Sequence, residues 1–296
     1  MVKHRVQASV DISDVAKKAA KSEYTDYLIY KKLGERRKKI ASPLGKLATS
    51  EYNHYQFWGK YCNIKEIKPN TLRVYLIIFL SYVLGNTFAI KFMENHESDV
   101  VALYRQVEGA VRPEDLEAYE QRIEDEEEHE KSFAEETKSS YLKYISFIIL
   151  GLADAIVEIS GIHAGSLGIY KSTEITGLAG IVAGASASIA MASAAYAQAK
   201  QGFQGKASVS AIFTGVSYFI NAVVLASPYF LTRSQPVALA VSVILAVLII
   251  AFTSYYNSVI SGSSFLRDFG ELAGIMLGAT AALYLFGLAL SSVTGI

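Results

Sequence analysis

This chain of 296 residues has no excess of charge of either sign and contains a single cysteine. Because 28 Lys and Arg balance 28 Asp and Glu, the charge gives no basis for a nucleic-acid-binding surface, and we expect no nucleic-acid partner. The lone Cys62 excludes a disulfide scaffold, a zinc-finger cluster and a Cys-x-x-Cys redox pair. The first 30 residues lack an apolar stretch of signal-peptide length, so we expect the amino terminus to stay in the cytoplasm.

Charge is also scarce in one half of the chain. Of the 56 charged residues, 45 lie in residues 1–140 and 11 in residues 141–296. This partition indicates two environments and therefore two domains, which we place at residues 1–138 and 139–296. The predicted fold class is all-α, with a cytoplasmic four-helix bundle followed by a five-helix transmembrane domain.

The charge-poor half has windows long enough to cross a bilayer, which takes about 20 mostly apolar residues. One window, 144–170, is apolar except for Asp154, Glu158 and His163. Four more contain no Asp, Glu, Lys or Arg, namely residues 175–199, 207–232, 234–266 and 272–296. We therefore predict five spans in the cell membrane. A small excess of Lys and Arg in the inner loops agrees with a cytoplasmic amino terminus.

Three residues of the membrane domain are candidates for an ion path. Asp154 and Glu158 are four residues apart and share one helical face. Ionisable groups inside a span are costly and usually line a path for ions or protons, although hydration near the cytoplasmic boundary is the alternative. Met191, in the second span, offers a soft thioether to a transition metal, but a buried Met is more often a packing residue. We expect His163 to be hydrogen-bonded or interfacial.

The charge-rich half contains helix-forming sequence with prolines near two helix starts. A four-helix bundle is the natural way to bury the apolar stripes of such helices. We predict these helices at residues 14–39, 43–61, 86–106 and 113–136.

A metal-ligand pattern occurs twice in this half. Glu51 with His54, and Glu126 with His129, form Glu-x-x-His motifs whose two side chains share a helical face. Each motif alone is weak, because Glu and His on a charged helix are usually solvated, and the second motif lies in the acidic run EDEEEHE.

A companion repeat makes the pattern more specific. Each Glu-x-x-His motif is preceded by a further Glu: Glu23 lies 28 residues before Glu51, and Glu97 lies 29 residues before Glu126. Glu23 and Glu97 are each followed by a Tyr seven residues later. Each half is therefore a helical hairpin in which one Glu can face a Glu-x-x-His motif.

Two such hairpins would supply the ligand set of di-iron carboxylate bundles, one Glu from each of two helices and a Glu-x-x-His from each of the others. Hard carboxylates with imidazole suit Fe or Mn, and the absence of thiolate ligands argues against a structural zinc site. Glu94, three residues before Glu97, is an additional candidate. The predicted ligands are Glu23, Glu51, His54, Glu94, Glu97, Glu126 and His129.

The first 140 residues resemble the ferritin-like bundle of rubrerythrins, because these seven residues match the ordered di-iron ligands of that family. The resemblance implies a ferritin-like domain with a di-iron cofactor, with Mn as the alternative metal. The chain departs from the family in having no rubredoxin module, since it has no Cys-x-x-Cys pair.

The remainder resembles the vacuolar iron transporter family through GLADAIVEISG in the first span and IAMASAAY in the second. In that family an acidic residue of the first span and a Met of the second line the metal path, which carries over to Asp154 and Met191. A Glu that commonly precedes the Tyr of the second motif is here Ala195. The two halves together resemble fused rubrerythrin and vacuolar-iron-transporter proteins, which implies a homodimer that exports Fe(II) in exchange for protons.

An uncharged segment of 17 residues, 74–90, is at the lower limit for a further span. If it crossed the bilayer, the hairpin with Glu97 and His129 would lie opposite the hairpin with Glu23 and His54. The di-iron site could not then form. We therefore expect a non-spanning segment that is buried in the bundle, in a dimer interface or at the membrane surface.

The sequence leaves three functions open. The first is an Fe(II) or Mn(II) exporter whose bundle binds, senses or delivers the metal. The second is an enzyme, a membrane-anchored di-iron ferroxidase or peroxidase. The third is a membrane-tethered iron sensor without either activity.

Overall fold

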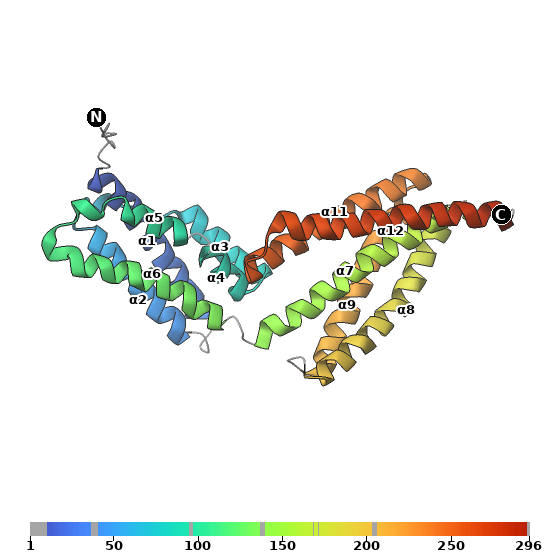
Figure 1. Cartoon of the computed structure of the whole chain (residues 1–296), viewed down its shortest axis with the longest axis horizontal. Helices are drawn as coiled ribbons and strands as arrows, with labels where there is room; N and C mark the ends of the chain where they lie inside the picture. The colour runs from blue at the N-terminus through green and yellow to red at the C-terminus, as the bar shows by residue number, and fades with distance from the viewer. Residues whose placement is uncertain are drawn as a thin grey trace, which may run out of the picture. The chain divides into compact units, whose positions relative to one another are not determined.

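The computed structural model describes residues 11–36, 41–94, 97–136, 140–167, 169–170, 172–202 and 206–294. Every regular element in these ranges is a helix, which confirms the all-α class. The chain divides into two compact units, residues 1–137 and 138–296, which Figure 1 shows as ribbons. Each unit is described by itself below.

The amino-terminal unit contains six α-helices and three short 3-10 turns among its described residues. The helices are α1 (Ile12–Arg36), α2 (Ala41–Trp58), α3 (Thr71–Val83), α4 (Asn86–Glu94), α5 (Glu97–Arg105) and α6 (Leu116–Glu136). The turns are η1 (Ile64–Glu66), η2 (Glu108–Ala110) and η3 (Pro113–Asp115). The helix predicted over 86–106 is divided between α4 and α5, and residues 95–96 between them lie outside the described ranges. That the unit is a ferritin-like bundle stays a prediction.

Helix α3 occupies most of the uncharged segment 74–90. It begins where the Asn70 side chain accepts a hydrogen bond from the Arg73 backbone N–H at 3.1 Å, and Gly85, with φ of 90°, turns the chain into α4. Its 13 residues extend for about 20 Å, less than the roughly 30 Å of a bilayer core. As expected, this helix is too short to count among the candidate spans.

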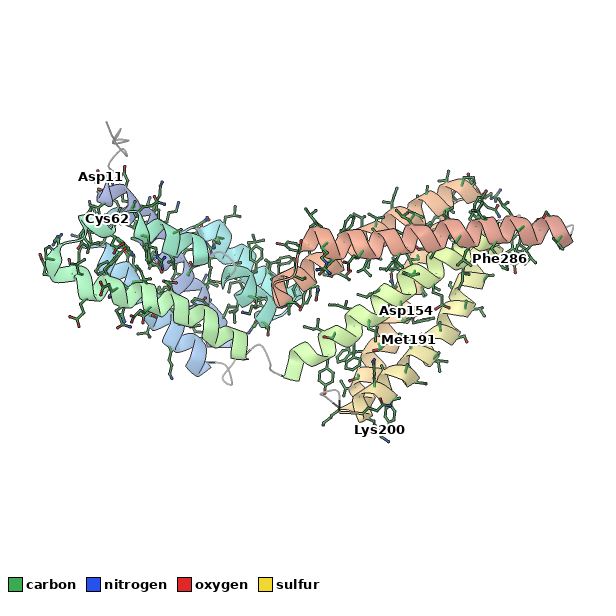
Figure 2. The ribbon with its side chains drawn as sticks, viewed as in Figure 1. Asp11, Cys62, Asp154, Met191, Lys200 and Phe286 are labelled. Carbon is green, nitrogen blue, oxygen red and sulfur yellow. The ribbon has the colours of Figure 1, made fainter. Side chains whose placement is uncertain are left out.

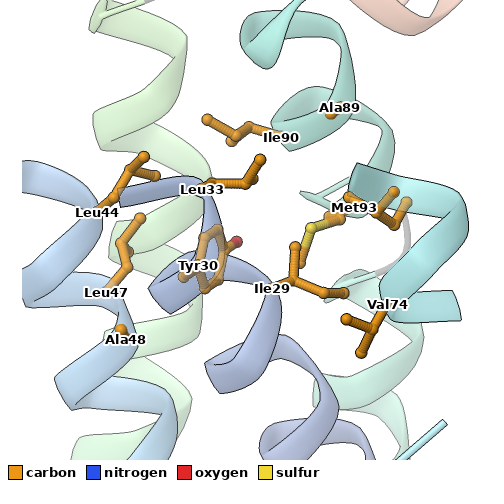
Figure 3. Packing of buried hydrophobic residues seen from close by; sticks show 11 residues of the cluster. Ile29, Tyr30, Leu33, Leu44, Leu47, Ala48, Val74, Ala89, Ile90 and Met93 are labelled. Atoms are coloured by element: carbon orange, nitrogen blue, oxygen red, sulfur yellow. The ribbon is translucent and has the colours of Figure 1, made fainter. Parts of the chain in front are cut away.

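Two apolar clusters hold the amino-terminal unit together. Figure 3 shows the first, the α3-side cluster, whose members come from α1 to α4: Ile29, Tyr30, Leu33, Leu44, Leu47, Ala48, Val74, Ile77, Ala89, Ile90 and Met93. The second, the Trp58 cluster, gathers Val15, Ala16, Ala19, Ala20, Phe57, Trp58, Tyr104, Val107, Val111 and Tyr119. Both clusters contain residues from α1 and α2, so these two helices pack along their length through both ends of the core.

Among its described residues, the carboxyl-terminal unit contains five helices that are long and apolar enough to cross a membrane, which agrees with the predicted number of spans and indicates a multi-pass membrane protein. They are α7 (Ser140–Leu167), α8 (Thr173–Lys200), α9 (Ala207–Ala226) with the short α10 (Pro228–Leu231), α11 (Gln235–Ser261) and α12 (Phe265–Thr294). Helix α7 contacts all four of the other long helices.

Polar side chains of α9 hold it against α7. Thr214, Ser217 and Asn221 donate hydrogen bonds to the α7 backbone carbonyls of residues 147, 148 and 152, at 3.1, 3.2 and 2.9 Å. Because lipid provides no hydrophobic force between helices, such interhelical hydrogen bonds and close backbone contacts stabilise packing in a membrane. Small residues at this contact, including Gly151, let the backbones approach.

We predict that the contact between α7 and α12 depends on Gly287. A Cβ atom built there would clash with the backbone O of Gly165, whereas a Cβ at Gly278 on the same helix would meet nothing within 4 Å. Gly287→Ala should therefore destabilise the protein by roughly 1–3 kcal/mol through overpacking. Gly278→Ala should be neutral or stabilising by up to about 1 kcal/mol. Thermal unfolding of both variants in one detergent measures this, and equal melting temperatures would contradict it.

Candidate metal centre

Four ionisable side chains meet in the interior of the amino-terminal unit. Glu23 comes from α1, Glu51 and His54 from α2, and Glu126 from α6, and each is at most 3% exposed. One ligand atom from each lies within 4.8 Å of the others. In the part of the chain that the structure describes, this is the one group of three or more His, Cys, Asp or Glu side chains close enough to share a metal ion.

The four side chains form a polar layer between the two apolar clusters. On α1, Glu23 lies between Ala20 of the Trp58 cluster and Ile29 of the α3-side cluster. On α2, the helical turn from Glu51 to His54 separates the same two clusters. The layer is therefore closed to water by apolar side chains along the helix axes, and it lies at the same level on both helices.

His54 is at the centre of the layer. Its Nδ1 is 2.9 Å from Oε1 of Glu126, and 3.8 Å from Oε2 of both Glu23 and Glu51. Ligand atoms opposite each other around one first-row metal lie about 4 Å apart, because each bond is about 2.1 Å. Small side-chain movements would close these four donors on one ion. The residues therefore fit a metal in number, chemistry and spacing.

Neighbouring polar groups hold the ligands in place. On the far side of the imidazole, His54 Nε2 is 3.3 Å from Asp125 Oδ2, and Asp125 Oδ1 accepts a 3.0 Å hydrogen bond from Gln121. The Tyr104 hydroxyl donates a hydrogen bond to Oε1 of Glu23. Such partners fix the tautomer and orientation of a metal-binding His and the position of a carboxylate.

Sequence reasoning missed both of these supporting roles. Asp125 lies in an acidic run where no spacing distinguishes one carboxylate from the next. Tyr104 belongs to the repeat that begins at Glu97, but its hydroxyl contacts the Glu of the other repeat, Glu23. The position of Tyr104 in the repeat was a signal that it belongs to the site, although the repeat did not indicate Glu23 as its partner.

The pKa values of the four groups show how the metal-free layer is held together. Burial and the charges of Glu126 and Glu23 raise the pKa of Glu51 well above its usual range. Burial and the charge of Glu23 raise the pKa of Glu126 to about 7. Burial disfavours the charged imidazole, but hydrogen bonds to Glu126 and Glu23 outweigh it and raise the pKa of His54 to about 10. Burial likewise disfavours ionised Glu23, yet hydrogen bonds from Glu51 and His54 lower its pKa overall.

These directions show how protons distribute over the layer. The lowered pKa of Glu23 favours its ionised form, and the raised pKa values of Glu51 and His54 favour their protonated forms. A metal ion must therefore displace protons in order to bind.

Three of the predicted ligands have side chains outside the described part of the structure. They are Glu94 at the end of α4, Glu97 at the start of α5, and His129 in α6. The described donors are enough for one ion, and the di-iron site with all seven ligands stays a prediction.

The predicted path residues lie on two helices of the membrane unit (Figure 2). Asp154 and Glu158 are half-buried on α7, and the Tyr218 hydroxyl of α9 donates a 2.5 Å hydrogen bond to Glu158. Met191 of α8 packs against an apolar cluster that includes Ile159 of α7. Their role in transport stays a prediction.

His163 differs from its expectation as a hydrogen-bonded or interfacial residue. Its side chain is fully buried on α7, and neither ring nitrogen has a hydrogen-bond partner among the described residues. The ring of Tyr229 lies against it, with 4.3 Å between the ring centroids.

Comparisons of the chain with protein-family models, with curated proteins and with solved structures find no match. The resemblances to rubrerythrins and to vacuolar iron transporters therefore stay predictions, and the case for a metal centre depends on the geometry above.

We predict that metal binding releases protons. A divalent ion should displace the proton of His54 and part of that of Glu126, about one to two per ion near pH 7, together with any proton on Glu51. Because these pKa values are raised, protons compete more strongly as pH falls, and affinity should rise with pH through the pKa of Glu126, about 7, toward that of His54, about 10. Calorimetric titration in buffers of different ionisation enthalpy counts the protons. Binding without proton release would contradict this ligand set.

We also predict that Asp125 tunes the affinity through His54. Asp125→Asn should weaken metal binding by roughly 10- to 100-fold, since the imidazole loses its anionic partner. Glu124→Gln is the matched control, because Glu124 is the preceding acid on α6 and its side chain is exposed. Equilibrium dialysis compares the two variants. Equal affinities would show that Asp125 has no part in the site.

Proposed function

We propose that this chain is a membrane transporter that moves Fe(II), or Mn(II), out of the cytoplasm in exchange for protons. In this proposal the amino-terminal bundle binds the metal and delivers or senses it. One observation carries the proposal. A buried set of three carboxylates and one imidazole occurs in the same chain as five helices long enough to cross a membrane.

The donor set favours this cargo. Fe(II) and Mn(II) take carboxylate oxygens together with imidazole nitrogens, and the described cluster contains no thiolate. Ca(II) and Mg(II) prefer oxygen ligands alone, and Mg(II) keeps several waters, so a closed pocket with an imidazole suits them poorly.

The membrane unit offers groups for translocation. Asp154 and Glu158 lie one turn apart on α7, which contacts every other long helix of the unit. Carboxylates in a span are costly to keep and suit a path for a cation and for the counter-moving proton. Met191 would favour a transition metal over Mg(II) or Ca(II) through its thioether. We expect two copies of the chain to assemble as a homodimer.

The test is metal flux in proteoliposomes that contain the full chain and a trapped metal indicator. We predict that Asp154→Ala abolishes Fe(II) and Mn(II) flux, because the path loses its carboxylate. The control is Glu271→Gln, since Glu271 is an exposed acid of α12 that pairs with Arg267 at 2.9 Å. Unchanged flux in Asp154→Ala would sink the proposed path.

The same sample distinguishes the enzyme from the transporter. Rapid Fe(II) oxidation without flux in the wild-type protein would favour a ferroxidase. Metal-dependent changes in the bundle with neither activity would favour a sensor.

A further inference from the structure

Within the part of the chain that the structure describes, helix α3 exposes a continuous apolar face. Leu72, Tyr75, Leu76, Phe79, Tyr82 and Val83 are each between 47% and 78% exposed. They follow Leu72 by three, four, seven, ten and eleven residues, so they lie along one side of the helix. We call this side the outer face of α3. A soluble protein rarely exposes so many large apolar side chains together, and such a patch marks an interaction site.

The opposite side of α3 is already occupied. Val74 and Ile77 are buried in the α3-side cluster, and the N–H of Asn70 donates a 2.9 Å hydrogen bond to Thr25 of α1. Arg73 also pairs with Asp26 of α1 at 3.3 Å. The helix is thus fixed to the bundle by its opposite side, and its outer face points away from the core.

We propose that the outer face of α3 binds the surface of an anionic lipid bilayer. The helix would lie in the plane of the interface, with its apolar side chains among the upper acyl chains. Tyr75 and Tyr82 suit this position, since a tyrosine presents an apolar ring and a polar hydroxyl to the boundary.

Charge around α3 favours anionic lipid as the partner. No Asp or Glu occurs between Glu66 and Glu94, while Lys and Arg do occur there. The ammonium of Lys32 lies 5.0 Å from the ring centroid of Tyr75, at the edge of the outer face, and Lys68 is exposed just before the helix. Cations beside an apolar helical face are typical of helices that bind anionic membranes.

The chain itself keeps a bilayer within reach. Helix α6 ends at Glu136, and α7 begins at Ser140 and contains the first candidate span from Tyr144, so three residues and about one helical turn join them. Such a connection spans at most about 20 Å. The bundle is therefore tethered to the membrane whatever ion the protein moves.

A second copy of this chain is the competing occupant. A stable protein interface buries about 800 Å² on each partner, and the six side chains offer about that area at their observed exposure. The area therefore suits either occupant. The cations beside the face favour an anionic lipid surface over a second copy that carries the same positive charge there.

The test places a fluorescent label on the face in the reconstituted full chain. Cys62 is the only cysteine, so a Cys62→Ser background allows single labels at Phe79→Cys or Leu72→Cys. Glu120→Cys, at an exposed position on α6, is the control. The chain is reconstituted in vesicles of phosphatidylcholine and phosphatidylglycerol, and two quenchers of the label are compared. One is a nitroxide on the lipid acyl chain, and the other is iodide added to the water.

We expect the nitroxide lipid to quench both α3 labels several-fold more than the control label, and iodide to quench them several-fold less. Stronger quenching by iodide would place the face in water and overturn the proposal. Protection from both quenchers would mean that protein covers the face, as in a dimer, and would overturn it too. Lys32→Glu with Lys68→Glu should reduce the lipid quenching; unchanged quenching would contradict the anionic-lipid assignment.

Discussion

Three carboxylates and an imidazole share a dry layer of the amino-terminal unit, and the rest of that unit is built around keeping them there. An unpaired charge in a protein interior costs several kcal/mol even after relaxation, so the layer needs positive charge in its midst. Without metal, protonated His54 supplies that charge, because its pKa is raised to about 10, while the lowered pKa of Glu23 favours a carboxylate beside it. A cation with carboxylate and imidazole ligands would satisfy the same layer with fewer protons.

The surrounding structure follows from this requirement. Apolar clusters above and below the layer exclude water, which strengthens the attraction between a cation and its ligands. Asp125 and Tyr104 orient the side chains that would bind it. Buried polar groups also need partners in the membrane unit. There Thr214 and Asn221 donate hydrogen bonds to backbone carbonyls of α7. The membrane unit contains few charged groups. Those few include Asp154 and Glu158, which the proposed transport would use.

The sequence predicted what depends on spacing and composition. Uncharged windows predicted the five long apolar helices, and seven-residue and 28-residue spacings predicted that Glu23 would meet the Glu51 motif. Spacing predicts which residues share a helical face. It does not predict that Nδ1 of His54 faces Glu126 or that Asp125 lies beside Nε2 of the same ring. The role of Asp125 was therefore not predictable, and the sequence left open which of three locations the segment 74–90 takes, since both depend on how separate helices pack.

X-ray absorption at the iron edge of the Fe(II)-loaded full chain, kept anaerobic, tests the metal centre most directly. The account predicts a first shell of oxygen and nitrogen atoms with the outer-shell scattering of one or more imidazoles. His54→Ala should remove part of that imidazole signal and weaken binding. A first shell containing sulfur, or a spectrum that His54→Ala leaves unchanged, would contradict the claim that the buried layer holds the metal.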